Sequence, residues 1–401
     1  MSAQLVIVGG GPVGLALARA ASTLAGVEVT VIERSPAAAV TPPEPFDHRV
    51  YALSPSSLGL LREIGANLAG QRMAMVRVMQ VWGDGRRTGG KGDGGNRDGG
   101  RHDEGRLVLE RGQPLAAIVE HAAVMQALQD SLSHGGRVKV LRGIWPVAMR
   151  PVDGNRRELE LSDGSKCVAD LLVAADGSKS QIRGWSGLSV ATKDYESDGV
   201  VANFRCEHPH GDIARQWFTY DGVMAWLPLP GNHISMVWSI GKEMSASLPS
   251  DDATAICRMV EATGHAELGT LSLVSPIARF PLSRIMASQW VQPGLALIGD
   301  AAHAVHPLAG QGVNLGFADV RHLVAVLDSR SRYAAIGDLA LLRRYERRSR
   351  EAAWAVGEMT DRLRSLYLSE AMPARWLRNE GVDWLNGLPA AKSLLIDYAT
   401  G

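Results

Sequence analysis

Residues 5–33 read LVIVGGGPVGLALARAASTLAGVEVTVIE, and this stretch decides the fold. A short apolar run at 5–8 predicts a buried strand, which leads into the glycine pattern GGGPVG at 9–14 and then into an alanine- and leucine-rich helix. A second apolar strand, 27–32, ends at Glu33. The order of strand, glycine turn, helix, strand and acid predicts the dinucleotide-binding unit of a Rossmann-like α/β fold.

Each glycine of the pattern has its own physical task. Gly9 permits a tight turn, Gly11 lets the backbone approach a pyrophosphate, and Gly14 lets the helix pack closely on the strand. The helix N-terminus offers free N–H groups and a positive dipole end to phosphates. Glu33 follows about 20 residues later, where its carboxylate can accept hydrogen bonds from a ribose. The same bare pattern at 90–95, GKGDGG, has no strand before it and no helix after it, so we reject it.

Composition excludes several classes of function. The 401 residues include 42 basic and 42 acidic side chains, so the chain lacks the basic footprint of a nucleic-acid-binding protein. Three widely spaced cysteines are typical of reduced thiols in a cytosolic protein, and none has neighbours at metal-ligand spacing. No apolar run approaches the roughly 20 residues that cross a bilayer. We therefore expect a cytoplasmic protein, or one peripheral to the inner face of the membrane.

The chain divides where its sequence pattern changes. Residues 83–105 contain ten glycines, ten charged residues and no hydrophobic residue, which predicts a flexible surface insertion. Successive strands with short turns over 195–280 predict a second, mainly antiparallel substrate domain. We expect a discontinuous dinucleotide-binding domain at 1–82, 106–190 and 283–337, the insertion at 83–105, the inserted sheet domain at 191–282, and C-terminal helices at 338–401.

Periodicity predicts further elements. Apolar side chains at three- and four-residue steps predict a helix over 112–132, and Asp163-Gly164 between two short strands predicts a hairpin. A similar apolar row predicts a long helix beyond residue 338, with five arginines at 343–350 beside that row. The arginines indicate either a solvated face or a surface for an anionic membrane or a partner.

Two further motifs follow along the chain. ADGSKSQIR at 175–183 comes directly after an apolar strand, although an Asp-Gly pair by itself is also typical of a simple turn. GDAAHAVHPLAGQGVN at 299–314 delivers a carboxylate, Asp300, at a strand end and then opens a helix with a glycine-rich turn. Asp300 can bind polyol hydroxyls, and the backbone N–H groups of 310–314 can point at a ring oxygen that gains negative charge. His303 and His306 have no evident acid or nucleophile partner, which favours structural roles.

The three motifs together resemble the fingerprints of the class A flavin-dependent monooxygenases, in the order and separation of that family, and the resemblance covers most of the chain. In that family the first fingerprint binds the ADP part of FAD, the second is linked to both FAD and NAD(P)H, and the third contacts the ribityl chain and flavin ring. Four stretches are most similar to the ubiquinone-biosynthesis hydroxylase branch: RVYALSPSSLGLL, QWFTYDGVMAWLPL, HPLAGQGVNLGFADV and AKSLLIDYATG.

The resemblance implies a set of site residues. Arg49 matches an arginine that lies near the flavin in the family, and Arg49 and Pro307 are the flavin-face candidates. Two departures are His121, where the branch often has asparagine, and Lys179, where arginine is common. No metal site is expected, and no acid–base residue is nominated for the substrate. The implied cofactor-binding residues are Gly9, Gly11, Pro12, Val13, Gly14, Glu33, Arg34, Arg49, His121, Asp176, Gly177, Gly299, Asp300, Pro307, Gly310, Gln311, Gly312, Val313 and Asn314.

The function that the resemblance implies is FAD-dependent hydroxylation of an aromatic ring. NAD(P)H, as co-substrate, would reduce the flavin, and the reduced flavin would activate O₂ for transfer of one oxygen to a phenol-type ring. The implied substrate is a prenylated phenol of ubiquinone biosynthesis, held in an apolar pocket between the antiparallel sheet and the flavin. Trp217, Tyr220 and Trp226 lie on strands that would form this pocket, although such aromatic residues often belong to a core instead.

Three alternatives remain open from the sequence. A class A hydroxylase of a small soluble aromatic acid would need a pocket arginine for the carboxylate, for which Arg205 and Arg215 are candidates. A flavin-dependent reductase or dehydrogenase of the same fold would not consume O₂ in step with product. A non-catalytic FAD-binding scaffold of a biosynthetic complex would show no substrate-stimulated oxidation of NAD(P)H.

Overall fold

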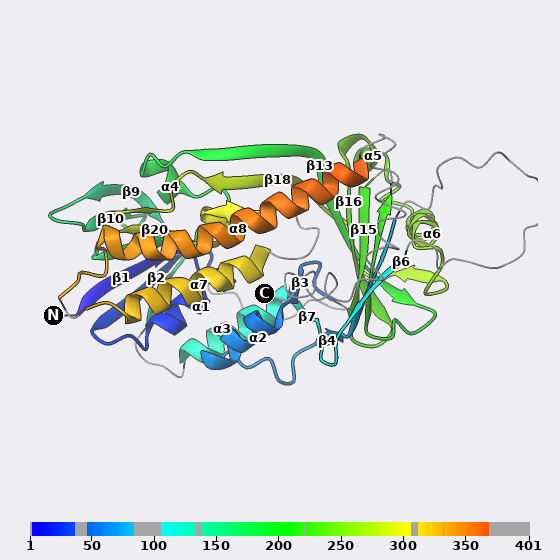
Figure 1. The fold of residues 1–401 in the computed structure, drawn as a ribbon, viewed down its shortest axis with the longest axis horizontal. Coiled ribbons are helices and arrows are strands. Elements are labelled where there is room, and N and C mark those ends of the chain that lie inside the picture. Colours follow the sequence, from blue (N-terminus) through cyan, green and yellow to red (C-terminus); the bar gives the residue numbers. More distant parts are fainter. Residues whose placement is uncertain are drawn as a thin grey trace, which may run out of the picture.

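The computed structural model describes residues 2–36, 46–83, 106–133, 138–219, 222–305, 312–331 and 333–368. Two large sheets and two three-stranded sheets organise this part of the chain, and most of the helices lie along the first large sheet (Figure 1). The predicted insertion, apart from Gly83, lies outside the described residues. So do the predicted site residues Pro307, Gly310 and Gln311, together with His306 and Tyr220.

The first large sheet has six strands, and its core is parallel. The strands β1, β2, β8, β12 and β20 pair in parallel, and β19 adds one antiparallel edge strand. Residues 5–8 are fully or almost fully buried, as expected for a parallel strand covered on both faces. In spatial order the strands are β19 (Val291–Gln292), β20 (Leu295–Leu297), β12 (Leu171–Ala174), β1 (Ala3–Val8), β2 (Val27–Glu33) and β8 (Val138–Arg142).

The opening motif forms the predicted unit. Helix α1 (Pro12–Ala21) follows β1 directly and joins it to β2, so the strand–turn–helix–strand order is confirmed. Since the other strands of this sheet come from residues 138–174 and 291–297, the Rossmann-like domain is discontinuous, as predicted. The fold class is therefore confirmed as α/β with an inserted, mainly antiparallel sheet.

Helices pack on one another beside this sheet (Figure 1). Helix α1 contacts α3 and α7, while α7 also contacts α2 and α8. The predicted long helix beyond residue 338 is present, and Leu342, Tyr345 and Ser349 form its buried row. The helices are α2 (Pro55–Glu63), α3 (His121–Ser133), α4 (Gln181–Trp185), α7 (Gly312–Asp328) and α8 (Leu339–Leu368).

A three-stranded antiparallel sheet packs on the same core. It consists of β9 (Pro146–Pro151), β10 (Arg157–Leu161) and β11 (Lys166–Ala169), and the side chains of Leu159 and Leu161 are buried in the core of the first sheet. The turn between β10 and β11 holds Gly164 at φ +81°, which confirms the predicted hairpin.

The second large sheet has nine strands. All its pairings are antiparallel except that of β14 with β5. The main path, in spatial order, is β21 (His303–Ala304), β18 (Ala278–Ala287), β13 (Val190–Cys206), β16 (His233–Gly241), β15 (Gly222–Leu229), β14 (Ile213–Thr219), β5 (Val78–Trp82) and β6 (Arg106–Glu110), with β17 (Leu271–Leu273) beside β13.

The sheet domain therefore differs from its predicted bounds. Strands β5 and β6, which we expected in the dinucleotide-binding domain, pair with β14 at the edge of the nine-stranded sheet. The β14–β5 pairing joins residues far apart in the chain, so local sequence pattern gave no indication of it.

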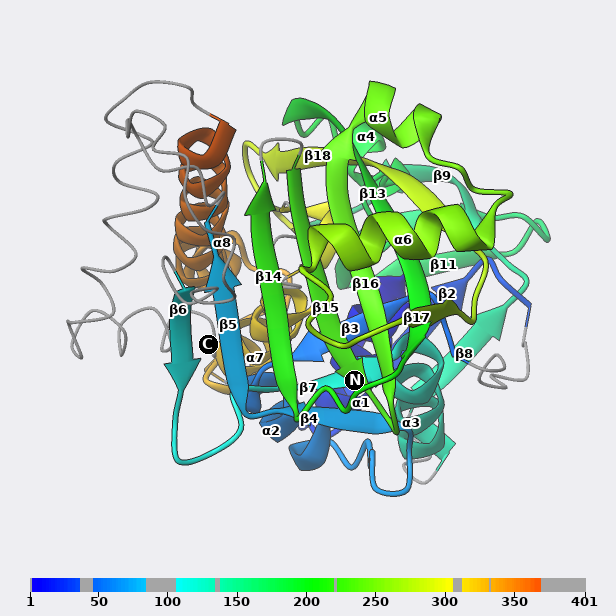
Figure 2. The ribbon, with the colours of Figure 1, turned by 90° about the vertical axis from the view of Figure 1, so that its right-hand side faces the viewer.

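Helix α6 (Ala253–Thr263) lies across one face of the nine-stranded sheet, and the short helix α5 (Lys242–Ser247) follows β16 (Figure 2). Asp252 caps α6, because its carboxylate accepts hydrogen bonds from the backbone N–H groups of Thr254 and Ala255, each 2.9 Å long.

The two faces of the nine-stranded sheet carry different side chains. Under α6, large side chains including Trp217, Trp226 and Trp238 form one buried cluster. The aromatic residues Trp217 and Trp226 that were considered for the substrate pocket are therefore core residues on the opposite face. The other face carries smaller side chains and borders the cavity described below.

The helix that we predicted over 112–132 is wrong in its first part, which belongs to a second three-stranded sheet. Residues Ala116–Glu120 form strand β7, which pairs with β3 (Val50–Leu53) on one side and β4 (Met73–Val76) on the other, and α3 begins only at His121. Ile118 and Val119 are both buried, so tertiary pairing on both edges overrides the helical spacing of the apolar residues.

Candidate active site

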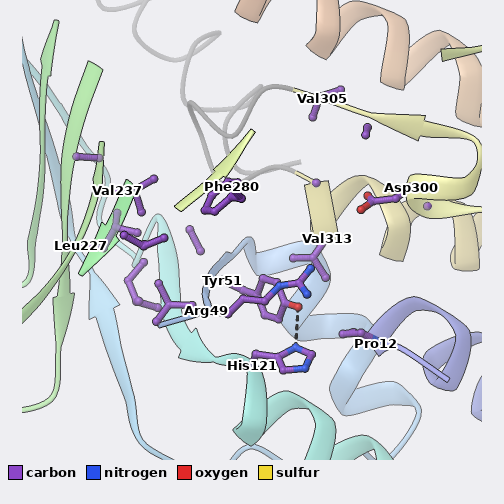
Figure 3. Close-up of a pocket in the computed structure, with 18 of the residues that line it drawn as sticks. Pro12, Arg49, Tyr51, His121, Leu227, Val237, Phe280, Asp300, Val305 and Val313 are labelled. Carbon is purple, nitrogen blue, oxygen red and sulfur yellow. Dashed lines mark hydrogen bonds between the residues drawn. The ribbon is translucent and has the colours of Figure 1, made fainter. Parts of the chain in front are cut away.

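A cavity of about 970 Å³ is lined by residues of both large sheets (Figure 3). Pro12 and Asp300 lie on one side of it, and Leu227 and Val237 lie on the other. All three sequence motifs contribute to its wall, although they are far apart in the chain. The motif residues at the wall are Gly9, Gly11, Pro12, Val13, Asp176, Gly177, Gly299, Asp300, Gly312 and Val313.

The glycines of the first motif have distinct surroundings. A Cβ added to Gly14 would lie 2.0 Å from the carbonyl oxygen of Gly9, so only glycine allows this contact between helix and turn. Gly9 itself has φ +110°, and a Cβ there would lie 2.3 Å from the carbonyl oxygen of Ala175. Gly11, in contrast, has no heavy atom within 4 Å of an added Cβ, and it faces the cavity.

The acid of the first motif stands beside this turn. The Glu33 carboxylate accepts hydrogen bonds from the backbone N–H of Gly10 and, at 2.7 Å, from that of Ser35. These bonds orient the carboxylate at the cavity wall and leave further lone pairs available. Its neighbour Arg34 is exposed, and its guanidinium donates to Oε1 of Gln181 at 3.2 Å instead of lining the cavity.

The second motif presents an unpartnered carboxylate oxygen. Oδ2 of Asp176 accepts from the backbone N–H of Gln181 at 2.9 Å, whereas Oδ1 is buried and has no partner among the described residues. Burial raises the pKa of Asp176. Arg183, at the end of the motif, is buried and donates to the carbonyl oxygens of Ser178 and Ala301, both at 2.8 Å. Arg183 thus fastens the second motif to the third.

The third motif places Asp300 at the cavity with its carboxylate free. No hydrogen bond to Asp300 is formed within the described part of the chain, and its side chain is accessible from the cavity. Burial raises the pKa of Asp300, although the positive charges of His303 and Arg49 oppose this effect. Asp300 is therefore accessible to a ligand in the cavity and has no hydrogen-bond partner among the described residues.

His303 has an acid partner that we did not predict. Its Nε2 lies 2.7 Å from Oδ2 of Asp319, and both side chains are almost fully buried. Burial lowers the pKa of His303, but the Asp319 carboxylate outweighs burial and raises it above its ordinary value. The same Asp319 oxygen accepts from the backbone N–H of Gly299 at 2.8 Å. Helix α7 brings Asp319 back to the motif, and no local spacing in the sequence indicates this.

Asn314 bridges elements of the fold. Its Nδ2 donates to the carbonyl oxygen of Ala52 at 2.8 Å, and its Oδ1 accepts from the Ser54 N–H and the Ser57 hydroxyl at 3.1 and 2.6 Å. Both the nitrogen and the oxygen of the side-chain amide are thus engaged in the fold, and the backbone N–H of Asn314 lies in the first turn of α7, where it has no partner within the helix.

Arg49, Tyr51 and His121 form one corner of the cavity. The Tyr51 hydroxyl lies 2.8 Å from Nδ1 of His121, and the Arg49 guanidinium lies 5.5 Å from the centre of the Tyr51 ring (Figure 3). Burial raises the pKa of Tyr51 to about 12, while burial and Arg49 lower that of His121. At neutral pH the Tyr51 hydroxyl therefore donates to a neutral His121.

Comparison with known proteins identifies this arrangement. Residues 2–360 match the protein family described as FAD binding domain. The chain belongs to this family of FAD-dependent monooxygenases. It is 33% identical to 3-demethoxyubiquinol 3-hydroxylase of Escherichia coli K12 over 417 residues, covering 99% of this chain and 98% of that protein. It is 32% identical to the Drosophila melanogaster ubiquinone biosynthesis monooxygenase COQ6, mitochondrial, covering 99% and 90% of the two chains.

Solved structures share the fold of this monooxygenase. Pseudomonas putida p-nitrophenol 4-monooxygenase PnpA superposes with a TM-score of 0.75 at 16% identity, covering 100% of this chain and 98% of that one. The Diels-Alderase PyrE3 superposes with a TM-score of 0.72 at 22% identity, covering 100% and 80%. The family match and the curated relatives confirm the predicted family, cofactor and enzyme class: the protein is an FAD-dependent aromatic hydroxylase.

The cavity residues fit FAD. The N-terminus of α1 has no side-chain cap and no acid in its first turn, so its N–H groups are available to a phosphate beside the open face of Gly11. The unpartnered Oδ1 of Asp176 and the free carboxylate of Asp300 can accept hydrogen bonds from a bound polyol. Among the described residues, no group of three His, Cys, Asp or Glu side chains is placed to hold a metal ion, and no helix could span a membrane.

Of the two arginines considered for an aromatic acid, Arg215 lines the cavity and Arg205 does not. Arg205 is exposed and does not line the cavity. Arg215 lies opposite Trp226 in the register of β14 and β15, on the α6 side of the sheet, and its guanidinium donates to the carbonyl oxygen of His210 at 3.1 Å.

Proposed function

We propose that this monooxygenase hydroxylates the aromatic ring of a prenylated phenol in ubiquinone biosynthesis. The observation that carries the proposal is a single cavity in which the three motifs face an apolar wall made by the nine-stranded sheet. Ala225, Leu227 and Val237 contribute to this wall, which suits a substrate with a hydrocarbon chain. The names of the relatives from Escherichia coli and Drosophila, which match almost the whole chain, support the same substrate class.

In this proposal FAD extends along the motif side of the cavity. Its ADP part lies against the Gly9–Gly14 turn, and Glu33 accepts hydrogen bonds from the ribose. Asp300 binds hydroxyls of the ribityl chain, and the N-terminal turn of α7, with Gly312 and Val313, faces the flavin. The roles predicted for Arg34, Pro307, Gly310 and Gln311 remain predictions, because Arg34 points away from the cavity and the other three lie outside the described residues.

Bound FAD, reduced by NAD(P)H, supplies the activated oxygen in the overall reaction: ring C–H, O₂, NAD(P)H and a proton give ring C–OH, NAD(P)⁺ and water. The protein residues position and screen the reactants. The α7 N-terminus would direct backbone N–H groups at the flavin ring oxygen that gains negative charge. The apolar wall excludes water from the aromatic ring of the substrate. Tyr51 and His121 remain uncharged in their corner, so they add no competing charge beside Arg49.

The small aromatic acid hydroxylase is the less favoured function. Such an enzyme needs a cation that pairs with the substrate carboxylate. Arg205 does not line the cavity, and Arg215, although it lines the cavity, donates to the backbone carbonyl oxygens of His210 and Ile213. A reductase or a scaffold is likewise not favoured, since the chain is a member of the monooxygenase family over 359 of its 401 residues, 2 to 360.

We also propose peripheral contact with an anionic membrane or with a biosynthetic complex, since a prenylated substrate resides in a membrane. The side chains of Arg343, Arg344, Arg347 and Arg350 on α8 are exposed, and Trp354 is 56% exposed on the same helix. Basic and aromatic side chains together favour the headgroup region. Co-sedimentation with vesicles containing anionic lipid, but not with zwitterionic vesicles, would support this contact.

A genetic experiment tests the substrate class. The protein is removed from its host and the quinone pool is extracted. Accumulation of an under-hydroxylated prenylated precursor, reversed by the intact chain but not by Asp300→Ala, supports the proposal. An unchanged quinone pool, together with NAD(P)H-coupled turnover of a soluble aromatic acid, would assign the enzyme to the other class of hydroxylase.

A further inference from the structure

The mainly apolar wall that the nine-stranded sheet gives the cavity includes a few polar residues: Gln216, Arg215 and Ser239. Gln216 lies on β14, directly opposite Ala225 of β15, and Ala225 lies opposite Val237 of β16. Residues opposite each other in an antiparallel pair project to the same face. Since Gln216, Ala225 and Val237 all line the cavity, the amide of Gln216 belongs to the cavity face of the sheet.

The neighbours of Gln216 along β14 confirm this direction. Trp217, the next residue, is buried in the cluster under α6, on the opposite face. Ala214, two residues before, lines the cavity like Gln216. Successive side chains of a strand point to opposite faces, so the alternation assigns Gln216 to the cavity side.

No hydrogen bond joins the Gln216 amide to the described residues, and the amide is not one of the fully buried side-chain groups without a partner, so it is accessible from the cavity. Only 5% of its surface is exposed, so the group is almost completely removed from bulk solvent. An amide that faces the cavity and has no hydrogen bond to the described residues keeps its donors and its acceptor available to a ligand. Across the cavity lie the motif residues assigned to FAD, which leaves the space next to the sheet for the substrate.

We propose that Gln216 binds a neutral ring oxygen of the substrate and so orients the aromatic ring in the cavity. This inference rests on the proposed function, and it adds the residue that selects for substrate chemistry. An amide can donate to a methoxy or carbonyl oxygen and can accept from a phenol hydroxyl. It carries no charge to offset a buried carboxylate, so an uncharged phenol is favoured over an aromatic acid.

A chemical double-mutant cycle tests the contact. Gln216→Met keeps a long unbranched side chain and removes the amide, and Gln216→Leu is a second variant in case the first is unstable. Gln126→Met is the matched control, because Gln126 lies on α3 and donates to Asp130 at 2.8 Å, away from the cavity wall. The ligands are a short-chain prenylated phenol and the matching prenylated benzene, titrated against the FAD-loaded full-length enzyme by the change in flavin absorbance.

Gln216→Met is expected to weaken binding of the prenylated phenol about tenfold, the effect of one lost buried hydrogen bond, and to leave binding of the prenylated benzene unchanged. Less product should form per NAD(P)H oxidised, because a ring that is no longer oriented reacts less efficiently. FAD content and melting temperature should match those of Gln126→Met.

Three outcomes would overturn the assignment: equal weakening of both ligands, unchanged phenol binding and coupling, or a loss of FAD in the Gln216 variants. The last outcome would mean that the amide contacts the cofactor. The proposed function is tested separately, by turnover of the prenylated phenol in the wild-type enzyme, and that test does not depend on the Gln216 variants.

Discussion

Replacing Asp300 with alanine should separate cofactor binding from folding. The Asp300 carboxylate lines the cavity and forms no hydrogen bond within the described residues, so its removal leaves no protein group unpaired. The pKa of Asp300 is raised, which means that the folded protein disfavours its ionised form. Such a group contributes stability only at low pH, and that contribution is lost as pH rises through the folded pKa. At neutral pH the FAD-free variant should therefore be at least as stable as the FAD-free wild type.

The expected effect of Asp300→Ala on FAD affinity is larger than its effect on the stability of the FAD-free protein. A hydrogen bond to a charged group contributes about 1.5–3 kcal/mol, which corresponds to a rise of about 10- to 150-fold in the dissociation constant of FAD. The change is measured by titrating the FAD-free protein with FAD and following the quenching of flavin fluorescence. Thermal unfolding of the same FAD-free samples reports on stability.

Asn314→Ala is the matched comparison in the same motif. It removes three hydrogen bonds within the fold, to Ala52, Ser54 and Ser57, and should lower the free energy of unfolding by about 1–3 kcal/mol or more. The reasoning is refuted if Asp300→Ala binds FAD as tightly as wild type. It is also refuted if the FAD-free Asp300→Ala protein loses as much stability as Asn314→Ala.

Three other changes have defined outcomes. Gly14→Ala should lower the free energy of unfolding by about 1–3 kcal/mol or more, since its Cβ would meet the backbone. Gly11→Ala should fold normally and lose FAD affinity, because an added Cβ meets no protein atom there. Thermal unfolding and FAD titration distinguish the two variants. Replacing 84–104 with a short glycine–serine linker should leave melting temperature and FAD binding intact, because Trp82 and Arg106 are already paired neighbours on β5 and β6; a large fall in melting temperature would show a structural insertion. The pKa of His303 is raised from 6.5, so its contribution to stability is complete below pH 6.5 and is lost as pH rises through its pKa in the folded protein. His303→Gln should therefore make the free energy of unfolding in urea depend less on pH. An unchanged pH dependence would contradict the pairing with Asp319.

Local patterns predicted the elements whose causes are local. The glycine turn at 9–14 and the strand ending at Glu33 depend on steric contacts between near neighbours, and the long helix beyond residue 338 depends on its own apolar row. The glycine turn and Glu33 indicated a dinucleotide, and the resemblance that the three motifs carry together implied that the dinucleotide is FAD.

Features that depend on contacts between residues far apart in the chain could not be predicted from the sequence. Strand β7 has helical spacing of apolar residues, but β3 and β4 supply hydrogen bonds on both its edges. The alternation of β14 separates two faces, yet both faces are buried, so the sequence alone did not show that Gln216, and not Trp217, faces the cavity. The partner of His303 was missed because Asp319 lies 16 residues further along the chain, on α7.

Turnover of the purified, FAD-loaded protein in ¹⁸O₂ tests the central claim most directly. With NAD(P)H and a short-chain prenylated phenol, we expect substrate-stimulated NAD(P)H oxidation and a product with one ¹⁸O atom on the ring for each molecule formed. FAD, and not FMN, should be released from the same sample by heat. A product without ¹⁸O, or NAD(P)H oxidation that no phenol stimulates, would contradict the assignment of this cavity to aromatic hydroxylation.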